Sequence, residues 1–342
     1  MLHGIRPDPR FLVSNACVLH CEMRAIVYRD FGTPDVLKME EVAKPVPADD
    51  EVLVAVRAAG VNAFDWYMVR GRPALFRLLL GSGKKPLGVD LAGEVEAVGR
   101  NVTRFKPGDQ VFGTGRDKMR AKRGSFAEYV SVLERALAIM PRNATFAQAA
   151  AVPVVGLTAL QGLRDRGRVE RGQKVLINGA SGGIGTFAVQ IAKAFGADVT
   201  GVCSTRNVDL VRGIGADHVI DYTRENFTAG VTRYDVILDI VSSQSWPACR
   251  RVLTPGGKYL PVGGPPGRGI SLMLLEPFTR GKLVTFVARV NAGDLNVIRE
   301  MIEAGVVTPV IDRTYKLEET ADAVRYVAAG HTRGKVVIAI GG

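Results

Sequence analysis

A short glycine-rich segment, residues 178–185 (NGASGGIG), restricts the possible folds of this chain more than any other feature. It follows the apolar run 175–177 (VLI), which is typical of a buried strand, and it leads into a helical pattern over 184–195. A strand, a tight glycine turn and a helix in this order form the phosphate-binding unit of dinucleotide folds. Backbone without side chains can approach a pyrophosphate there while free N–H groups at the helix start point at it.

Each position of this turn has an expected role. Gly182 lets the backbone approach the pyrophosphate, and Gly185 lets the helix pack closely on the strand, whereas Ala180 replaces the first glycine of the usual G-x-G-x-x-G pattern. A glycine run alone is weak evidence, because many loops carry glycine only for their turns. Here the flanking strand and helix, and the βα units that follow, support a cofactor site. The residues that we expect to contact the cofactor in this turn are Ala180, Ser181, Gly182, Gly183 and Ile184.

The period of the hydrophobic pattern changes near residue 148. Before it, short segments with strand-like patterns are separated by Pro-Gly and glycine-rich turns, which predicts a barrel-like β domain; examples are 51–57, 93–99 and 110–113. After it, strands alternate with helices, which predicts a doubly wound parallel sheet; the strands are 174–177, 198–203, 219–221, 235–239 and 257–262. A helix over 318–329 and a strand over 335–340 end the chain. A chain of 342 residues fits two domains better than one.

The first 22 residues have no periodicity, and a strand pattern begins abruptly at Met23. Our hypothesis is that Met23 is the natural start and that residues 1–22 are a disordered extension; the alternative is a short targeting or docking segment. No apolar run approaches the roughly 18 residues that a membrane-spanning helix needs. The four cysteines, at 17, 21, 203 and 249, form no evenly spaced framework, so we expect a reducing, cytoplasmic setting.

The net charge of +11 raises the question of an anionic partner. Lysine and arginine are scattered apart from one cluster over residues 116–123, and no aromatic residues alternate with these cations as a base-stacking surface would require. The pattern therefore favours a solvated basic loop near an anionic cofactor over a nucleic-acid site. RNA binding through this loop stays open as an alternative that predicts strong salt dependence.

The second predicted strand of the parallel sheet ends in the segment that should select the cofactor. NAD-dependent enzymes place Asp or Glu there for the ribose 2′-hydroxyl, but residues 202–207 (VCSTRN) contain no carboxylate. Ser204 and Arg206 instead suit a 2′-phosphate through charge-assisted hydrogen bonds, and Tyr222 adds a hydroxyl after the third strand. We therefore predict NADPH rather than NADH; the alternative is that Arg206 only caps the next helix in solvent.

Three separated motifs make the sequence similar to the medium-chain dehydrogenase/reductase superfamily: 86–93 (PLGVDLAG), 99–109 (GRNVTRFKPGD) and 179–185 (GASGGIG). Within that superfamily it resembles the zinc-independent quinone oxidoreductases and their enoyl-reductase-like relatives, from Met23 to the C-terminus. The resemblance implies an α/β fold with a Rossmann domain, a doubly wound parallel sheet, at 148–288. It also implies a GroES-like β-barrel catalytic domain formed by 23–147 and 289–342.

The zinc-dependent branch of the superfamily binds its catalytic metal through Cys and His ligands, together with acidic residues. At the corresponding places this chain has 60–65 (GVNAFD) and 88–90 (GVD), which supply neither Cys nor His. No cysteine occurs between residues 22 and 202, so the four-cysteine structural zinc lobe is also missing. We therefore expect no metal site.

The resemblance also assigns residues to the substrate side of the cleft, namely Asn62, Asp65 and Tyr67. Tyr67 is expected to donate its phenolic proton to the substrate, with packing under the following loop as the alternative. Asn62 either orients the substrate or holds the cleft backbone by hydrogen bonds. Asp65 is expected to fix local structure rather than to act as a base.

On the cofactor side, the resemblance implies that the Thr158 hydroxyl faces the nicotinamide and that Lys335 is a basic cleft residue. Val241 and Gly263 stand at the ends of later parallel strands, where ligands of open α/β sheets bind. For each of these residues the alternative is ordinary packing. The apolar loop 71–85 is either a lid over a lipophilic substrate or a short buried helix. In the family, the strand corresponding to 283–288 often pairs with the same strand of a second subunit across a twofold axis, so a homodimer is expected.

Together these features predict a zinc-independent, NADPH-dependent reductase of quinones or α,β-unsaturated carbonyls, acting on a small hydrophobic electrophile by hydride transfer. A zinc-free alcohol or aldehyde dehydrogenase is one alternative. A non-catalytic NADPH-binding sensor or partner protein is another, because no cleft residue is an obligatory acid or base.

Overall fold

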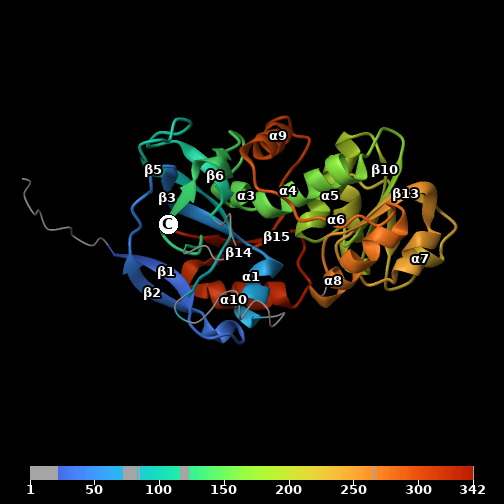
Figure 1. Ribbon diagram of the computed structural model, residues 1–342, viewed down its shortest axis with the longest axis horizontal. Coiled ribbons are helices and arrows are strands. Elements are labelled where there is room, and N and C mark those ends of the chain that lie inside the picture. The colour runs from blue at the N-terminus through green and yellow to red at the C-terminus, as the bar shows by residue number, and fades with distance from the viewer. Residues whose placement is uncertain (1–21, 72–82, 84, 116–122, 265, 342) are drawn as a thin grey trace, which may run out of the picture.

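A computed structural model describes residues 22–71, 83, 85–115, 123–264 and 266–341 of the chain (Figure 1). The predictions for the N-terminal extension, for most of the apolar loop 71–85 and for the basic cluster up to residue 122 lie outside this part. Within the described residues, no helix has both the length and the apolar character needed to cross a lipid bilayer.

The predicted parallel sheet is present, and its five strands follow the order β11-β10-β9-β12-β13. All four neighbouring pairs are parallel. The strands are β9 (Lys174–Asn178), β10 (Asp198–Cys203), β11 (His218–Asp221), β12 (Tyr234–Asp239) and β13 (Leu253–Pro261). The order reverses direction between β9 and β12, and this is the edge at which a doubly wound sheet binds ligands.

Helices accompany this sheet, as the alternating pattern predicts. They are α4 (Pro153–Gln161), which continues into a π-helical turn (Gly162–Gly167), α5 (Gly183–Ala194), α6 (Val208–Gly213), α7 (Trp246–Arg251) and α8 (Pro266–Leu275). The central strand β9 is buried on both faces, since Val175, Leu176 and Ile177 have no exposed surface. A run that is apolar on both faces is what a central parallel strand requires.

A mixed sheet forms the other end of the molecule (Figure 1). Its strands follow the order β14-β15-β3-β5-β6-β8, with β7 also paired to β3, and a smaller sheet has the order β2-β1-β4. The strands are β1 (Glu22–Tyr28), β2 (Lys38–Ala43), β3 (Glu51–Val61), β4 (Lys85–Pro86), β5 (Asp90–Val98), β6 (Gln110–Thr114), β7 (Tyr129–Leu133), β8 (Leu137–Ile139), β14 (Ile311–Lys316) and β15 (Lys335–Ala339). The last strand, β15, pairs antiparallel with β3, so the C-terminal segment returns to the sheet formed by strands within residues 51–139.

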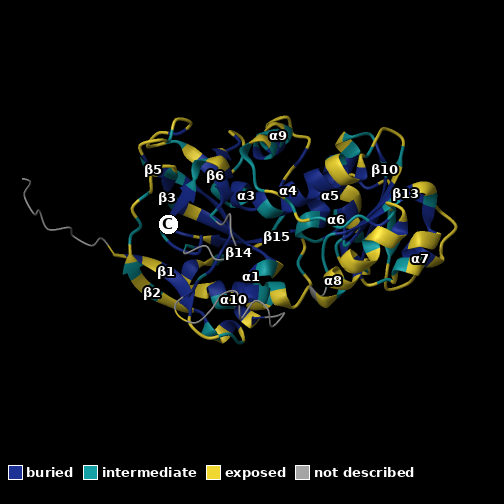
Figure 2. Cartoon of the chain, in the orientation of Figure 1, coloured by how far each residue is buried: buried dark blue, intermediate teal, exposed yellow. Residues whose placement is uncertain are grey.

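The remaining helices are α1 (Ala63–Arg70), α3 (Phe146–Ala150), α9 (Ala292–Glu303) and α10 (Thr320–Ala328). They pack on the mixed sheet or on one another, and α9 also contacts α4. One hydrophobic cluster contains Phe112 of the mixed sheet, Leu157 of α4 and Ile177 of the parallel sheet, so the core is continuous between the two sheets. Figure 2 shows this buried band through α3, α4 and α5. The predicted α/β fold is therefore confirmed.

One segment differs from its expected form. Residues 283–288 do not form a strand of their own; Leu283 makes an isolated parallel bridge to Tyr259 of β13, and the chain then runs on without regular structure. A strand needs a partner for its backbone groups, and the described part of this single chain offers none beyond that bridge.

Candidate active site

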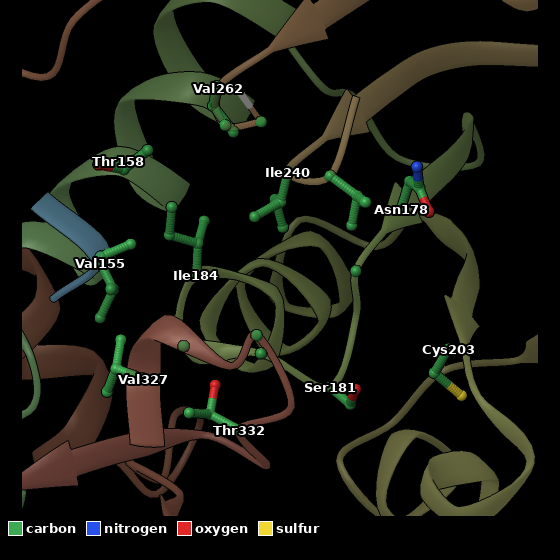
Figure 3. A pocket seen from close by; sticks show the side chains of 18 of the residues that line it. Val155, Thr158, Asn178, Ser181, Ile184, Cys203, Ile240, Val262, Val327 and Thr332 are labelled. Carbon is green, nitrogen blue, oxygen red and sulfur yellow. The ribbon is translucent and has the colours of Figure 1, made fainter. Parts of the chain in front are cut away.

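A cavity of about 1350 Å³ lies at the carboxyl ends of the parallel strands, between the two sheets. Its walls come from α1 and α4, from the glycine turn before α5, and from the loop between α10 and β15. Figure 3 shows Val155 and Thr158 of α4, Ser181 of the glycine turn and Thr332 of the C-terminal loop around this space. This volume is somewhat larger than that of most small-molecule sites, about 300–1,000 Å³. It therefore suits an elongated ligand.

The cavity brings together all but two of the residues that the sequence assigns to the site. Those that line it are Asn62, Tyr67, Thr158, Ser181, Gly182, Gly183, Ile184, Ser204, Arg206, Tyr222, Val241, Gly263 and Lys335. One exception is Asp65, a buried residue that does not line the cavity; its Oδ2 accepts a hydrogen bond from Asn62 N at 2.8 Å at the start of α1. The other exception is Ala180, because it is fully buried and its methyl group packs beneath the turn, where a Cβ on Gly201 would lie 3.1 Å away. Its contact with a cofactor is therefore not supported by its position.

The glycine turn has one glycine that the fold requires and one that it does not. A Cβ at Gly185 would lie 2.1 Å from the carbonyl oxygen of Gly179, so the close contact between turn and helix excludes any side chain there. At Gly182 a Cβ would meet only the same oxygen, at 3.6 Å, and its φ of −85° suits any residue. The space over Gly182 opens into the cavity at the amino end of α5, and this space fits a pyrophosphate.

The polar end of the cavity contains the residues expected at a 2′-phosphate. The Ser204 hydroxyl accepts a hydrogen bond from Asn207 Nδ2 at 3.3 Å, and Tyr222 is largely exposed. The Arg206 guanidinium donates to the carbonyl oxygen of His331 at 3.0 Å, so it links two parts of the chain and does not cap α6. Asn207 also donates to the Ser181 hydroxyl at 3.0 Å, which ties this end to the glycine turn.

Sequence reasoning missed several lining residues of this region, including Asn207, His331 and Thr332. Asn207 stands next to the predicted group and could have been found from it, since a short polar residue after a strand is a common turn and cap former. The loop with His331 and Thr332 carries no motif that would predict a binding role. It reaches the cavity only because the fold brings it beside the glycine turn, where Gly334 N donates a hydrogen bond to Ser181 O at 2.8 Å.

Asp239, at the end of β12, organises the opposite wall. This fully buried carboxylate accepts hydrogen bonds from Asn178 Nδ2 at 2.8 Å, Ser242 N at 2.7 Å and Tyr259 Oη at 2.8 Å. It thereby connects the ends of β9, β12 and β13. Burial, followed by the charge of Asp239, raises the pKa of Tyr259, so the phenol stays a donor.

The loop after β12 is held in an unusual conformation by this network. Ser242 has a φ of 53°, which is uncommon for a residue with a side chain, and its hydroxyl donates to Gly263 O at 2.8 Å. Val241 and Gly263 are thus placed side by side at the cavity. The signal in the sequence was the strand end alone; Asp239 itself was not singled out.

Two hydroxyls line the cavity from different helices. Thr158 Oγ1 donates to the carbonyl of Val154, one turn earlier on α4, at 2.7 Å. Tyr67 Oη on α1 is 3.5 Å from the carbonyl oxygen of Gly264, the outer limit of a hydrogen bond. This weak contact leaves the Tyr67 proton available for a better acceptor.

A buried polar cluster closes the inner end of the cavity. Lys335 Nζ donates to Asn62 Oδ1 at 2.7 Å and to Val61 O at 2.9 Å, and it lies 3.5 Å from Asp90 Oδ2. Asn62 Nδ2 donates to Asp90 Oδ2 at 2.9 Å. Both ends of the Asn62 amide are therefore engaged by the protein, which favours its role in holding the cleft over direct orientation of a substrate.

Desolvation acts on both charged members of this cluster. Burial raises the pKa of the Asp90 carboxyl, and the attraction of Lys335 opposes the rise. Burial lowers the pKa of Lys335, and the attraction of Asp90 opposes that shift in turn. The methylene chain of Lys335 also crosses the start of α5, since a Cβ on Gly183 would lie 3.0 Å from Lys335 Cδ.

The donor set of this region does not fit a zinc ion. The segments 60–65 and 88–90, which the resemblance matches to the zinc-ligand positions, contain neither His nor Cys, and the local positive charge is the Lys335 ammonium. No group of three or more His, Cys, Asp or Glu side chains suited to a metal occurs among the residues that the structure describes. Imidazole and thiolate, which zinc sites use most, are missing from the described cluster.

Two protein families match the sequence: the alcohol dehydrogenase GroES-like domain over residues 48–142 and the zinc-binding dehydrogenase family over residues 214–338. A Solanum lycopersicum protein named 2-methylene-furan-3-one reductase is 35% identical, over 95% of this chain and 81% of that protein. A chloroplastic NADPH-dependent alkenal/one oxidoreductase of Arabidopsis thaliana is also 35% identical, over 93% of this chain and 79% of that protein.

Solved structures give the same picture for the fold. A quinone oxidoreductase from Coxiella burnetii superimposes with a TM-score of 0.86 and 29% identity, covering 94% of this chain and 100% of that one. An Escherichia coli quinone oxidoreductase complexed with NADPH gives a TM-score of 0.78 and 26% identity, covering 92% of this chain and 99% of that one.

Proposed function

The chain belongs to the medium-chain dehydrogenase/reductase superfamily, in the branch of the quinone oxidoreductases, and we propose that it reduces quinones or α,β-unsaturated carbonyls with NADPH. The observation that carries this proposal is the open space over Gly182 at the amino end of α5, continuous with a polar pocket that contains Arg206. A dinucleotide with an extra phosphate matches both features.

The residues of the cavity divide the work of binding. Backbone groups of 181–184 would hold the pyrophosphate, and Ser204, Arg206 and Tyr222 would hold the 2′-phosphate. Val241 and Gly263 would border the nicotinamide ribose, with the Thr158 hydroxyl near the ring. NADPH, when bound, supplies a hydride to an electron-poor carbon.

The substrate end is lined mainly by apolar groups. Phe64, Val89 and Phe286 border the cavity beside Tyr67, and such a wall excludes water and suits a small hydrophobic electrophile. Tyr67 would donate its proton to the substrate oxygen as negative charge develops there. The reaction is proposed to need no zinc, because the cluster of Asn62, Asp90 and Lys335 contains neither imidazole nor thiolate, and its one carboxylate already faces the Lys335 ammonium at 3.5 Å.

Three further proposals concern the state of the protein. We propose that residues 148–288 form the Rossmann domain within a catalytic domain of 23–147 and 289–342, which is supported by the pairing of β15 with β3. A homodimer is supported by Val287, which is 87% exposed. We keep the cytoplasm as the proposed compartment, since Cys203 and Cys249 are free, buried thiols.

The test is a steady-state assay of NADPH and NADH consumption with a quinone, an enone and an aldehyde, and of the reverse reaction with an alcohol. The proposal predicts turnover of the quinone or the enone with NADPH. Preferential alcohol oxidation with NAD would support a zinc-free alcohol dehydrogenase instead. Tight NADPH binding without turnover of any of these compounds would support a sensor or partner protein.

A further inference from the structure

We propose that Asp90 is a positioning residue that fixes the starts of α1 and α4, and through them the hydroxyls of Tyr67 and Thr158. The inference rests on the proposed function, in that these two hydroxyls face the reacting groups. Asp90 is fully buried and does not itself line the cavity. Its effect on the reaction would therefore pass through the helices that it holds.

The first contact is with α4. Asp90 Oδ1 accepts a hydrogen bond from Val154 N, in the first turn of this helix, at 3.0 Å. The residue at the N-cap position is Val152, whose side chain cannot accept a hydrogen bond. The carboxylate of β5 thus satisfies one of the free N–H groups of α4 and places negative charge at the positive end of the helix dipole. Thr158 is tied to the same turn, since its hydroxyl donates to Val154 O at 2.7 Å.

The second contact is with the start of α1. Asn62 is the N-cap residue of this helix, and its main-chain N–H donates to Asp65 Oδ2 at 2.8 Å. The Asn62 side chain also reaches Asp90, where Nδ2 donates to Oδ2 at 2.9 Å. The orientation of the residue from which α1 begins is therefore set by the carboxylate, and Tyr67 follows it on the same helix.

The surroundings leave the carboxylate little freedom to move. Gly60, its partner on β3, has no room for a side chain, because a Cβ would lie 3.2 Å from Asp90 Oδ2 and 2.5 Å from Ala150 O. Lys335 Nζ, at 3.5 Å, balances the charge. A buried charge that is paired and accepts several hydrogen bonds is held in one orientation, since any other would leave donors unsatisfied.

The matched variants are Asp90→Asn and the reciprocal swap Asn62→Asp/Asp90→Asn. In Asp90→Asn, one oxygen can still serve Val154, but an NH2 group faces the donors of Asn62 and Lys335. The swap returns a carboxylate to the cluster, because the new carboxylate at position 62 can accept from Lys335 and from the amide introduced at position 90. Asp239→Asn is the control, since that carboxylate is equally buried but holds the loop after β12.

Hydrogen–deuterium exchange and steady-state kinetics are measured on the same preparations of each variant. We expect Asp90→Asn to speed amide exchange at the starts of α1 and α4 but not in α5, and to lower kcat by on the order of 10–100-fold. KM for NADPH should change much less, and the swap should restore both exchange and kcat. Asp239→Asn should instead speed exchange in the loop after β12.

Unchanged exchange at both helix starts in Asp90→Asn would overturn the inference, as would a folded swap variant that restores neither property. If the swap variant does not fold, exchange in the single variant decides alone. Because exchange needs no substrate, a wild-type protein that turns over no electrophile would contradict the proposed function while leaving this test intact.

Discussion

The Arg206 guanidinium, just after β10, donates a hydrogen bond to the main-chain carbonyl of His331, which precedes β15, at 3.0 Å. A second link runs in parallel, from Gly334 N to Ser181 O at 2.8 Å. The loop before β15 therefore crosses the end of the cofactor cavity that lies against the parallel sheet. A 2′-phosphate bound there would meet a guanidinium that is already oriented by the protein.

Replacement of this side chain tests the cofactor preference. We expect Arg206→Ala to weaken NADPH binding by about 1.5–3 kcal/mol, the range for a hydrogen bond to a charged group, or roughly 10–100-fold in Kd. NADH binding should hardly change. Isothermal titration calorimetry with both cofactors measures this, with Arg212→Ala, exposed on α6 and outside the cavity lining, as the control. An equal loss for NADPH and NADH would contradict the assignment.

The hydroxyl of Tyr67 has only a long contact to Gly264 O, at 3.5 Å, so its proton is free to be transferred. If it is the proton donor, Tyr67→Phe should lower kcat by on the order of 10²-fold and leave Kd for NADPH unchanged. Tyr326→Phe is the control, because its hydroxyl bonds to Asp312 at 2.9 Å outside the cavity. A kcat equal to that of the wild type would assign Tyr67 to packing alone.

Asp294 predicts a specific loss of stability in acid. Burial opposes its ionisation, but hydrogen bonds from Asn291, Arg164 and Gln161 hold the pKa of Asp294 below its usual value. The lowered pKa means that this carboxylate stabilises the fold fully above its unfolded-state pKa, about 3.9, and that the stabilisation is lost as pH falls through the folded-state pKa.

The corresponding variant is Asp294→Asn, followed by thermal melts from pH 7 down to about pH 3. We expect a Tm below that of the wild type at pH 7. The free energy of unfolding should fall by about 1–3 kcal/mol, because the charged hydrogen bonds of Asp294 are lost. The difference in Tm between wild type and variant should become smaller below about pH 4, because Asp294 of the wild type is then protonated and uncharged as well. A difference that is constant over the whole range would show that ionisation of Asp294 contributes nothing.

The proposed homodimer predicts a monomeric variant. Val287 is 87% exposed in a segment whose backbone, at 286–288, makes no hydrogen bond to the described part of the chain. Val287→Asp should convert a dimer into a monomer in analytical ultracentrifugation. Val231→Asp, at a site that is 93% exposed, should leave the dimer intact. A wild-type protein that sediments as a monomer would refute the dimer.

Local sequence patterns were sufficient to predict most helices and strands and much of the cavity lining. The apolar run of β9 and the glycines after it lie within a dozen residues, so the strand, the turn and α5 could be predicted together. Ser204 and Arg206 followed from the same reasoning, because they stand where β10 ends.

The remaining parts depend on contacts between distant segments. Asp239 accepts hydrogen bonds from Asn178 and Tyr259, and Asp90 accepts them from Val154 and Asn62. In the sequence, each is only one acidic residue in or at the end of a strand, and nothing there indicates its partners. Ala180 was expected to contact the cofactor because it occupies a motif position, but a methyl group that packs on Gly201 cannot also face the cavity. Segment 283–288, which the resemblance expects to be a strand, pairs within the described part of the chain only through the bridge from Leu283 to Tyr259.

The central claim is that a pyrophosphate occupies the space over Gly182, and the most direct test is calorimetric titration of NADPH into Gly182→Ala. Nothing in the described part of the protein requires glycine at this position, so Tm should stay within about 1 °C of the wild type while Kd rises by at least roughly tenfold. Gly213→Ala, with open space around it in α6 and outside the cavity lining, should bind NADPH normally. Wild-type affinity in Gly182→Ala would contradict the account.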